Sequence, residues 1–357
     1  MEKRIKYNFK VVRMKRIVIV SPFYNGLYKY TRPLFEELKK RYSNNYEFIH
    51  VGNPHMTFDL DEIENTVDKL STQIIDLNPD IIHYNYGTYD VEQLIPYYLE
   101  KKGFRCKTFL TYHSLQLDIF KKINHPFYDE KVNEYMGKMD GYVFFTNYAK
   151  KIFYEKYPNS SKNYVIAFHP ATHLDYHLSL EKTKELDKKF NIDRTKPIAT
   201  LLGYSSHWKD TRPIIKLIEK YKDVTFFIGG PWWKEKILKE NEIVSLEDYK
   251  NLILINKELD NDMFIYAMDL GVGLFPYKYY KSFQGSGLLP NYLYRGINVV
   301  VSDINPLKEY AKNTVNFFND DELYVNFENA LKNPIVKKNL NFSYISHAEK
   351  IEKLYRR

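Results

Sequence analysis

Short apolar runs alternate with longer amphipathic stretches along most of the chain. Residues 16–20 (RIVIV) and 107–112 (KTFLTY) have the length and the β-branched or aromatic content of buried strands. Residues 60–77 instead repeat their apolar positions with the spacing of a helix that buries one face. Apolar strands that are separated by helices are typical of a parallel sheet covered on both sides. The pattern therefore predicts an α/β, doubly wound fold.

This alternation occurs twice, with a break between residues 169 and 196. Residues 173–195 are mostly polar, with a helical stretch at 179–190, and Pro170 and Pro197 lie on either side, which predicts a linker. Before the break we expect strands at residues 16–20, 46–51, 80–84, 107–112, 141–146 and 164–167, and helices at about 31–41, 60–77, 91–102 and 147–157. After it we expect strands at residues 198–203, 224–229, 252–255, 271–275 and 297–301, and helices at 211–221, 261–268 and 288–295.

The break divides the chain into two predicted domains. The first covers residues 16–172 and the second covers residues 196–341. A basic lead at residues 1–15 precedes them, and a charged amphipathic helix at residues 342–357 follows. A chain of 357 residues exceeds the size at which one hydrophobic core normally stops growing, which agrees with two domains.

The stretch 269–303 indicates what the second domain holds. It contains a strand, a glycine-rich turn at residues 284–287 (QGSG) and a short helix at 288–295. Glycines expose backbone N–H groups, and a helix start adds partial positive charge, so such a turn is suited to holding a phosphate. An ordinary β-α-β turn that binds nothing is the alternative.

Composition excludes several classes of protein. The single cysteine, Cys106, excludes an internal disulfide framework and a cysteine-rich zinc site, and it fits a reducing cytoplasm. No apolar stretch has the length of a membrane-spanning helix, and the basic start lacks the apolar segment of a signal peptide. We therefore expect a cytoplasmic protein.

The formal net charge of +8 leaves the partner open between several anionic molecules. Lysines and arginines are scattered among acidic residues, and no recognisable nucleic-acid module is present, so we expect no nucleic-acid partner. Basic clusters in the first domain could contact anionic lipid, which would place the protein peripherally at the inner membrane face; solvated helix faces are the alternative. The clusters are Lys101, Lys102, Arg105, Lys107, Lys121, Lys122, Lys150 and Lys151.

An ordered set of short motifs resembles the retaining GT-B glycosyltransferases of the group-1, or family-four, type. The resemblance runs through SPFYNG (21–26), FLTYHS (109–114), FFTNYAKKIF (144–153), AFHPATHLD (167–175), LLGYSSHWKD (201–210), FFIGGP (226–231), AMDLGVGLFPY (267–277), GSGLLPNYLYRGINVVVSD (285–303) and NFSYISHAEKIEKLYRR (341–357). It implies GT-B architecture, in which two Rossmann-like domains face a central cleft. The first domain would bind the acceptor, the second the nucleotide-sugar, and the last helix would cross back to the first domain.

The resemblance also implies an activity. The protein would be a hexosyltransferase-like enzyme that moves a sugar from a nucleotide-sugar donor to a hydroxyl of a glycan, a lipid-linked or another acceptor. The reaction would proceed with retention, without a metal and without a cofactor. A non-catalytic GT-B module that binds a partner or a glycan, and a nucleotide-sugar epimerase of the same fold, are the alternatives.

Transfer from such a donor requires positive charge and N–H donors at the departing diphosphate. Lys209 matches the phosphate-binding lysine of the family, and His113, at the end of a strand, is placed to touch the donor sugar or a leaving-group hydroxyl. An exposed lysine and a structural histidine are the alternatives. The expected catalytic residues are His113 and Lys209, and the expected donor-binding residues are Gly26, Gly203, Tyr204, Lys209, Gln284, Gly285, Ser286, Gly287 and Asn291.

Three positions depart from the family pattern. Tyr204 occupies the position of an arginine that would contact the diphosphate. Phe283 and Asn291 occupy the positions of two glutamates, the second of which would reach the ribose. An asparagine can still bond to hydroxyl groups but carries no charge. These losses are the reason to keep a non-catalytic module as an alternative.

We expect no metal site. The Asp-x-Asp run at residues 59–61 precedes a helix, where acidic residues serve as caps. His169, His173 and His177 are spaced as on a helix face, but Pro170 and the predicted linker argue against a metal triad.

Overall fold

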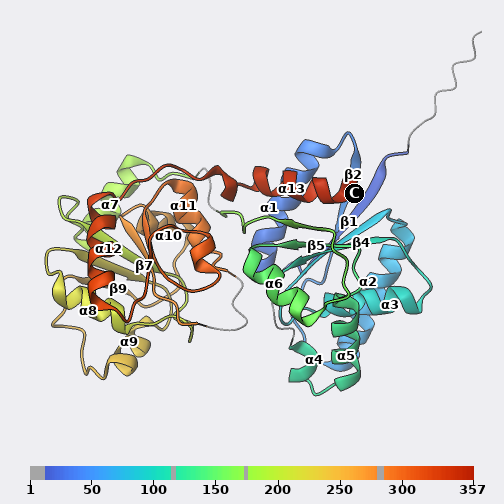
Figure 1. Cartoon of the computed structure of the whole chain (residues 1–357), viewed down its shortest axis with the longest axis horizontal. Helices are drawn as coiled ribbons and strands as arrows, with labels where there is room; N and C mark the ends of the chain where they lie inside the picture. Colours follow the sequence, from blue (N-terminus) through green and yellow to red (C-terminus); the bar gives the residue numbers. More distant parts are fainter. Residues whose placement is uncertain (1–12, 114–117, 173–175, 280–284) are drawn as a thin grey trace, which may run out of the picture.

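The computed structural model describes residues 13–113, 118–172, 176–279 and 285–357. Two six-stranded parallel sheets form two lobes that lie side by side, each with helices around its sheet (Figure 1). The predicted fold class, two doubly wound α/β domains, is confirmed. Among the described residues, no helix combines the length and the apolar character that crossing a membrane requires.

The order of the strands shows where each sheet can bind a ligand. The first sheet has the order β2-β1-β3-β4-β5-β6 and the second has the order β12-β11-β10-β7-β8-β9. The direction of winding therefore reverses between β1 and β3, and again between β7 and β10. Ligands of open parallel sheets bind at the carboxyl ends of the strands beside such reversals.

The strands match the predicted ones apart from small shifts at their ends. In the first sheet they are β1 (Lys15–Val20), β2 (Tyr46–Val51), β3 (Ile81–Tyr86), β4 (Lys107–Tyr112), β5 (Gly141–Phe144) and β6 (Tyr164–Ile166). In the second they are β7 (Ile198–Leu202), β8 (Thr225–Gly229), β9 (Leu252–Ile255), β10 (Val272–Phe275), β11 (Val299–Ser302) and the short β12 (Thr314–Val315). Only β12 lacks a predicted counterpart.

The helices differ more from the expectations. They are α1 (Asn25–Tyr42), α2 (Leu60–Leu77), α3 (Ile95–Lys101), α4 (Ile119–Lys122), α5 (Pro126–Met136), α6 (Asn147–Lys156), α7 (Leu180–Phe190), α8 (Arg212–Lys220), α9 (Trp233–Asn241), α10 (Asn261–Met268), α11 (Leu289–Arg295), α12 (Asp320–Lys332) and α13 (Tyr344–Arg356). Three short 3₁₀ turns lie at Val91–Leu94, Leu307–Glu309 and Leu340–Phe342.

Two helical expectations were wrong. The first helix begins at residue 25 rather than near Thr31, so Pro33 lies inside it and Gly26 belongs to its first turn rather than to a free loop. The helix expected at residues 91–102 begins as a 3₁₀ turn and becomes α-helical only at Ile95, before Pro96. Proline is tolerated early in a helix because the first N–H groups have no intrahelical partner.

Helix α13 completes the core of the first lobe. Its residues Ile351 and Leu354 are fully buried in the same apolar cluster as Ile17 and Ile19 of β1. The Tyr355 hydroxyl lies 2.5 Å from Nδ1 of His83, a fully buried residue of β3. The end of the described chain is thus packed into the sheet that its beginning forms (Figure 1).

Candidate functional site

A cavity of about 210 Å³ lies where loops of both lobes meet. The first lobe contributes the start of α1 and the residues that follow β4, β5 and β6, and the second lobe contributes residues near α11 and β12. The lining residues are Gly26, Leu27, Tyr30, His113, Phe145, His169, Gly285 and Tyr310. Three expected site residues, Gly26, His113 and Gly285, are thus brought together from distant parts of the sequence.

Rings make up the first-lobe wall of this cavity. The Tyr30 ring centre lies 4.6 Å from that of His113 and 5.2 Å from that of His169. The Phe145 ring packs on both histidines, with centres 5.0 and 5.1 Å away. Edge-to-face and tilted contacts of this kind fix ring orientations.

The histidines of this wall are held in the neutral form. Burial, together with the nearby His169 and His347, holds the pKa of His113 well below its ordinary value. Burial likewise lowers the pKa of His169 to about 4. At neutral pH the wall therefore offers uncharged hydrogen-bonding groups rather than positive charge.

Tyr30 is held from behind by α13. Its hydroxyl lies 2.6 Å from Nε2 of His347, whose Nδ1 lies 3.0 Å from the carbonyl oxygen of Phe168. Since a carbonyl can only accept, Nδ1 carries the proton and Nε2 accepts the tyrosine hydroxyl. Helix α13 thereby holds Tyr30, and with it the first-lobe wall of the cavity, in place.

Lys209 and Gly203 lie in the second lobe at the β7–β10 reversal; the second-lobe residues that line the cavity itself are Gly285 and Tyr310, and we refer to Lys209 and Gly203 as the second-lobe wall of the candidate site. The Lys209 side chain is buried, and its ammonium group donates to the Leu202 carbonyl oxygen at 3.0 Å. Its nitrogen lies 5.2 and 5.8 Å from the ring centres of Trp233 and Tyr277. Gly203 has a φ of 85°, and a Cβ added there would lie 3.4 Å from the lysine nitrogen. Glycine thus leaves the space beside this amine open.

Lys209 differs from the exposed lysine that was its alternative. Burial, and to a lesser extent the charge of Lys236, lowers the pKa of Lys209 to about 7. Two aromatic faces compensate part of the cost of burying a cation. A buried amine with this pKa gains a proton readily when an anion approaches.

The glycine-rich turn contacts both lobes. A Cβ on Gly285 would lie 2.7 Å from the Tyr310 hydroxyl, and one on Gly287 would lie 3.8 Å from the His169 ring. The Ser286 hydroxyl accepts the N–H groups of Leu288 and Leu289 at 3.3 and 3.2 Å. Two N–H groups at the start of α11 are therefore already paired within the turn. Gln284 lies outside the described residues.

Asn291 joins α11 to the segment that follows β6. Its side-chain oxygen accepts the backbone N–H of Thr172 at 2.8 Å and the Thr172 hydroxyl at 3.3 Å. Its amide nitrogen donates to the Gly287 carbonyl oxygen at 3.0 Å. The side chain is almost fully buried, so the geometry gives Asn291 a structural role, and its expected contact with a ribose stays a prediction.

Tyr204 lies at the edge of the second-lobe wall. Its side chain is half exposed, and its hydroxyl donates to the Glu258 carboxylate at 3.3 Å. The ring lies beside Trp232, with centres 5.8 Å apart. The position expected to hold an arginine thus presents an aromatic surface instead of a cation.

Only some of the residues that were considered as metal ligands lie in the described part of the chain. Asp59 caps α2 by accepting the N–H of Glu62 at 2.9 Å. His177 lies 3.2 Å from the Arg295 guanidinium, whereas His173 lies outside the described residues. Within the part of the chain that the structure describes, no three His, Cys, Asp or Glu side chains are grouped to hold a metal.

Five residues of the cavity were not expected from the sequence. They are Leu27 and Tyr30 of α1, and Phe145, His169 and Tyr310 from three further segments. Phe145 and His169 each lie just after a strand of the first sheet, at the edge where ligands bind. That position was a usable signal, whereas Tyr30 and Tyr310 meet only through the packing of the two lobes.

No protein-family model and no curated protein sequence matches the chain. Among solved structures, sucrose-phosphate synthase from Thermosynechococcus elongatus has a TM-score of 0.67 and 13% identity, over 96% of this chain and 98% of that chain. The Anabaena HepE protein, in complex with UDP and glucose, has a TM-score of 0.65 and 13% identity, over 96% and 100%. The UDP-GlcNAc 2-epimerase from Neisseria meningitidis has a TM-score of 0.58 and 13% identity, over 96% and 99%. These likenesses extend over nearly the whole chain, and the protein therefore has the GT-B fold.

Proposed function

We propose that this protein is a glycosyltransferase that moves a sugar from a nucleotide-sugar donor to a hydroxyl group of an acceptor. The observation that carries the proposal is the buried amine of Lys209 beside Gly203, at the reversal of the second sheet. A diphosphate at this place would meet positive charge where the chemistry requires it. The HepE complexes with UDP and with UDP-glucose support a nucleotide diphosphate as the leaving group.

The two walls suit the two products of bond cleavage. When the bond between the anomeric carbon and the diphosphate oxygen breaks, positive charge develops on the sugar and negative charge on the phosphate. Lys209 stabilises the phosphate, whereas the uncharged His113 and His169 can bond to sugar hydroxyls without repelling the cationic sugar. The proposed transfer is a direct attack by the acceptor hydroxyl on the anomeric carbon, with retention and without a metal.

The proposal is tested by Lys209→Met, with Lys216→Met as the matched control. Lys216 is an exposed lysine on α8 that pairs with Asp320 at 2.7 Å. Incubation with a panel of nucleotide-sugars should give turnover that the Lys209 variant loses about a hundredfold and that EDTA does not change. Absence of turnover and of nucleotide binding in the unmodified protein would contradict the proposal.

The pKa of Lys209 gives a second, independent test. At pH 8.5 the amine is mostly neutral in the empty protein because its pKa is about 7. A bound diphosphate raises this pKa, so UDP binding at pH 8.5 should take up about one proton, and much less at pH 6. Calorimetry in buffers of different ionisation enthalpy measures this uptake. The same uptake in Lys209→Met would show that another group takes the proton.

The alternatives make different predictions. The likeness to UDP-GlcNAc 2-epimerase favours testing whether UDP-GlcNAc is epimerised when no acceptor is present. The neutral Tyr204 and Asn291 instead favour testing for a module that binds nucleotide or glycan without turnover. NMR analysis of each nucleotide-sugar after incubation, with and without acceptor glycans, distinguishes transfer, epimerisation and binding alone.

A peripheral contact with anionic membrane is part of the proposal for a lipid-linked acceptor. Lys122 lies over the Phe58 and Tyr89 rings, at 3.9 and 5.3 Å from their centres, and Met56 and Tyr89 are exposed. A basic and aromatic surface of this kind suits a lipid headgroup layer. Sedimentation with anionic vesicles should be lost in Lys121→Glu/Lys122→Glu and at high salt, whereas Lys216→Glu should sediment like the unmodified protein.

A further inference from the structure

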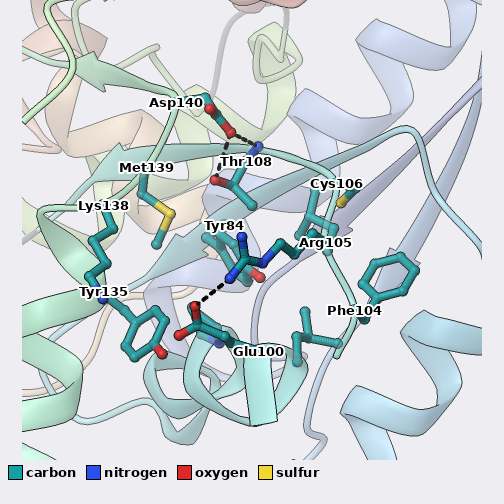
Figure 2. A pocket seen from close by; sticks show the side chains of 13 residues that line it. Tyr84, Glu100, Phe104, Arg105, Cys106, Thr108, Tyr135, Lys138, Met139 and Asp140 are labelled. Atoms are coloured by element: carbon teal, nitrogen blue, oxygen red, sulfur yellow. Dashed lines mark hydrogen bonds and ion pairs between the residues drawn. The ribbon is translucent and has the colours of Figure 1, made fainter. Parts of the chain in front are cut away.

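A second cavity, of about 310 Å³, lies within the first lobe (Figure 2). It is bounded by β3, by α3 and the start of β4, and by the segment that leads from α5 to β5. Its volume falls within the range of small-molecule sites. The lining residues are Ile82, Tyr84, Pro96, Leu99, Glu100, Phe104, Arg105, Cys106, Thr108, Tyr135, Lys138, Met139 and Asp140.

This cavity is separate from the cleft between the lobes. It opens beside Thr108, at the amino end of β4, whereas His113 faces the cleft after the carboxyl end of the same strand. The residues between these two positions span about 17 Å at the rise of an extended strand. A molecule in this cavity would therefore not occupy the proposed donor position.

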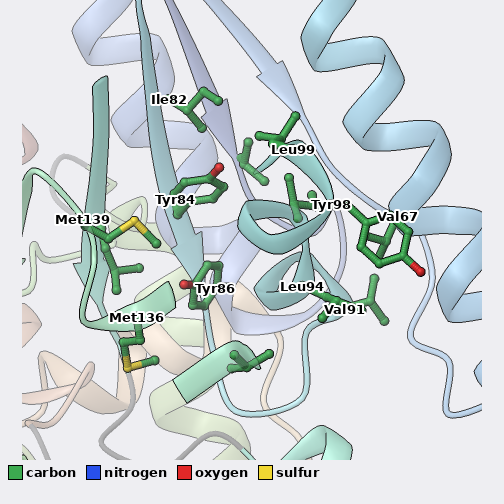
Figure 3. Packing of buried hydrophobic residues seen from close by; sticks show 14 of the residues in the cluster. Val67, Ile82, Tyr84, Tyr86, Val91, Leu94, Tyr98, Leu99, Met136 and Met139 are labelled. Atoms are coloured by element: carbon green, nitrogen blue, oxygen red, sulfur yellow. The ribbon is translucent and has the colours of Figure 1, made fainter. Parts of the chain in front are cut away.

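The inner part of the cavity is lined mainly by apolar side chains, and Tyr84 adds a hydroxyl there, whereas Cys106, Thr108 and the charged residues add polar atoms toward the rim. Ile82, Leu99 and Met139 belong to the apolar cluster of this lobe and surround Tyr84 (Figure 3). Tyr84 is fully buried, and its hydroxyl has no hydrogen-bond partner among the described residues. A buried hydroxyl without a partner costs free energy, and a ligand oxygen that pairs with it recovers that cost.

The charged side chains at the rim are already paired. Arg105 donates to Glu100 at 3.3 Å, and Asp140 accepts from the backbone N–H and the hydroxyl of Thr108 at 2.7 and 3.1 Å (Figure 2). Lys138 pairs with Glu134 on α5. The rim therefore presents balanced charge and does not select an anion or a cation.

We propose that this cavity is a second ligand site, for an uncharged and mainly apolar small molecule that carries one hydroxyl or carbonyl oxygen. The apolar body packs on Leu99 and Met139, and its oxygen bonds to the Tyr84 hydroxyl. The proposal does not depend on the function of the cleft.

Phenol and toluene are suitable probes because they have the same shape and differ in one hydroxyl group. Ligand-observed NMR titration should show phenol binding to the unmodified protein about tenfold more tightly than toluene. Tyr84→Phe should bind the two equally. It should also fold, because the hydroxyl that it loses bonds to no described residue.

Tyr142→Phe is the matched control. Tyr142 is a buried tyrosine of β5 whose hydroxyl donates to the Met136 carbonyl oxygen at 3.1 Å, and it does not line the cavity. This variant should keep the preference for phenol. Cys106, the single cysteine of the chain, lines the cavity and reports the place of binding. Phenol should slow its alkylation by iodoacetamide in the unmodified protein.

Three results would overturn the proposal: no binding of either probe, equal binding of both to the unmodified protein, or phenol binding that leaves the alkylation rate of Cys106 unchanged. The first two are measured without any variant, so they do not depend on how Tyr84→Phe folds. A preference for phenol that persists in Tyr84→Phe would likewise assign the hydrogen bond to another group.

Discussion

The two lobes meet at the cleft with different chemistry. The first lobe presents rings, among them His113 and His169, whose burial keeps them neutral. The second lobe presents one buried amine, Lys209, whose pKa of about 7 lets a nearby anion change its charge. Both lobes bury titratable groups at this place, but only the second has one whose pKa lies near neutral pH. This difference is the reason that the proposed function puts the anionic part of the donor on the second lobe and the uncharged part on the first.

The largest effect that we expect is a loss of stability in acid. Burial lowers the pKa of His83 and of His347 to about 3 and that of His169 to about 4. Between pH 6.5 and 4 the unfolded chain gains protons at these residues and the folded chain does not. The free energy of unfolding should therefore fall with falling pH, by at most about 1.4 kcal/mol per pH unit for each histidine.

Urea denaturation at several pH values measures this slope. His347→Gln should reduce it by the share of one histidine. An unchanged slope in His347→Gln would mean that α13 does not hold a neutral histidine behind the first-lobe wall.

The next effect concerns the bond between the lobes. Asn291→Ala removes the acceptor of two hydrogen bonds from Thr172 and leaves a buried N–H without its partner. We expect a loss of about 2 kcal/mol in the free energy of unfolding. Asn326→Ala, on α12, removes only a bond to the Glu322 carbonyl oxygen and should cost less than about 0.5 kcal/mol. If the two variants lose the same free energy of unfolding, the hydrogen bonds between Asn291 and Thr172 do not contribute to stability as proposed.

A glycine pair tests the second-lobe wall. Gly203→Ala places a Cβ at a φ of 85° and 3.4 Å from the Lys209 nitrogen, whereas Gly103→Ala places one at a φ of 74° in open space. Both should lose about 1–2 kcal/mol of stability from the left-handed backbone. Only Gly203→Ala should also weaken UDP binding, by about tenfold, as measured by calorimetry. If UDP binding is weakened in both variants, the effect does not come from the space beside Lys209, and this prediction is wrong.

The smallest effect is expected at Glu309. This carboxylate of the second lobe accepts the N–H groups of Asn147 and Tyr148, both at 2.7 Å, at the start of α6 in the first lobe. Glu309→Gln removes the charge from a helix N-terminus and should cost about 0.5–1 kcal/mol, less at high salt. Thermal unfolding in low and high salt measures this. A loss that salt does not change would assign the effect to the hydrogen bonds alone.

The fold was predictable because its strands are buried on both faces. Runs such as residues 16–20 and 198–203 are apolar at every position or nearly so, which is typical of strands in a parallel sheet that helices cover on both faces. The alternation of such strands with helices occurs twice along the chain, which predicts two lobes. Helices α4, α5, α9 and α12 were missed. The start of α12 did carry a signal, since Asn319 caps it and acidic residues fill its first turn. In α9, by contrast, the residue before the helix, Trp232, has a left-handed backbone and no side-chain cap.

Residues of the candidate site could be predicted from the sequence only where a single strand places them at its carboxyl end. Lys209 and His113 each follow a strand of the sheet that places them; the family resemblance points to Lys209, and the position at a strand end points to His113. Tyr30 and Tyr310 reach the cavity because α1 starts earlier than expected and because the lobes pack together. The burial that lowers the pKa of Lys209 was not visible in its own segment, since Trp233 and Tyr277 contribute to it from elsewhere in the chain.

The position of α13 has a consequence for the order in which this protein is built. The ribosome makes β1 before the second lobe and α13 after it, yet β1 and α13 share one apolar cluster. While the second lobe is being translated, Ile17 and Ile19 have no α13 to cover them, and His83 has no tyrosine hydroxyl beside it. The nascent first lobe therefore exposes apolar surface of its sheet for the time needed to translate the second lobe, and exposed apolar surface favours aggregation.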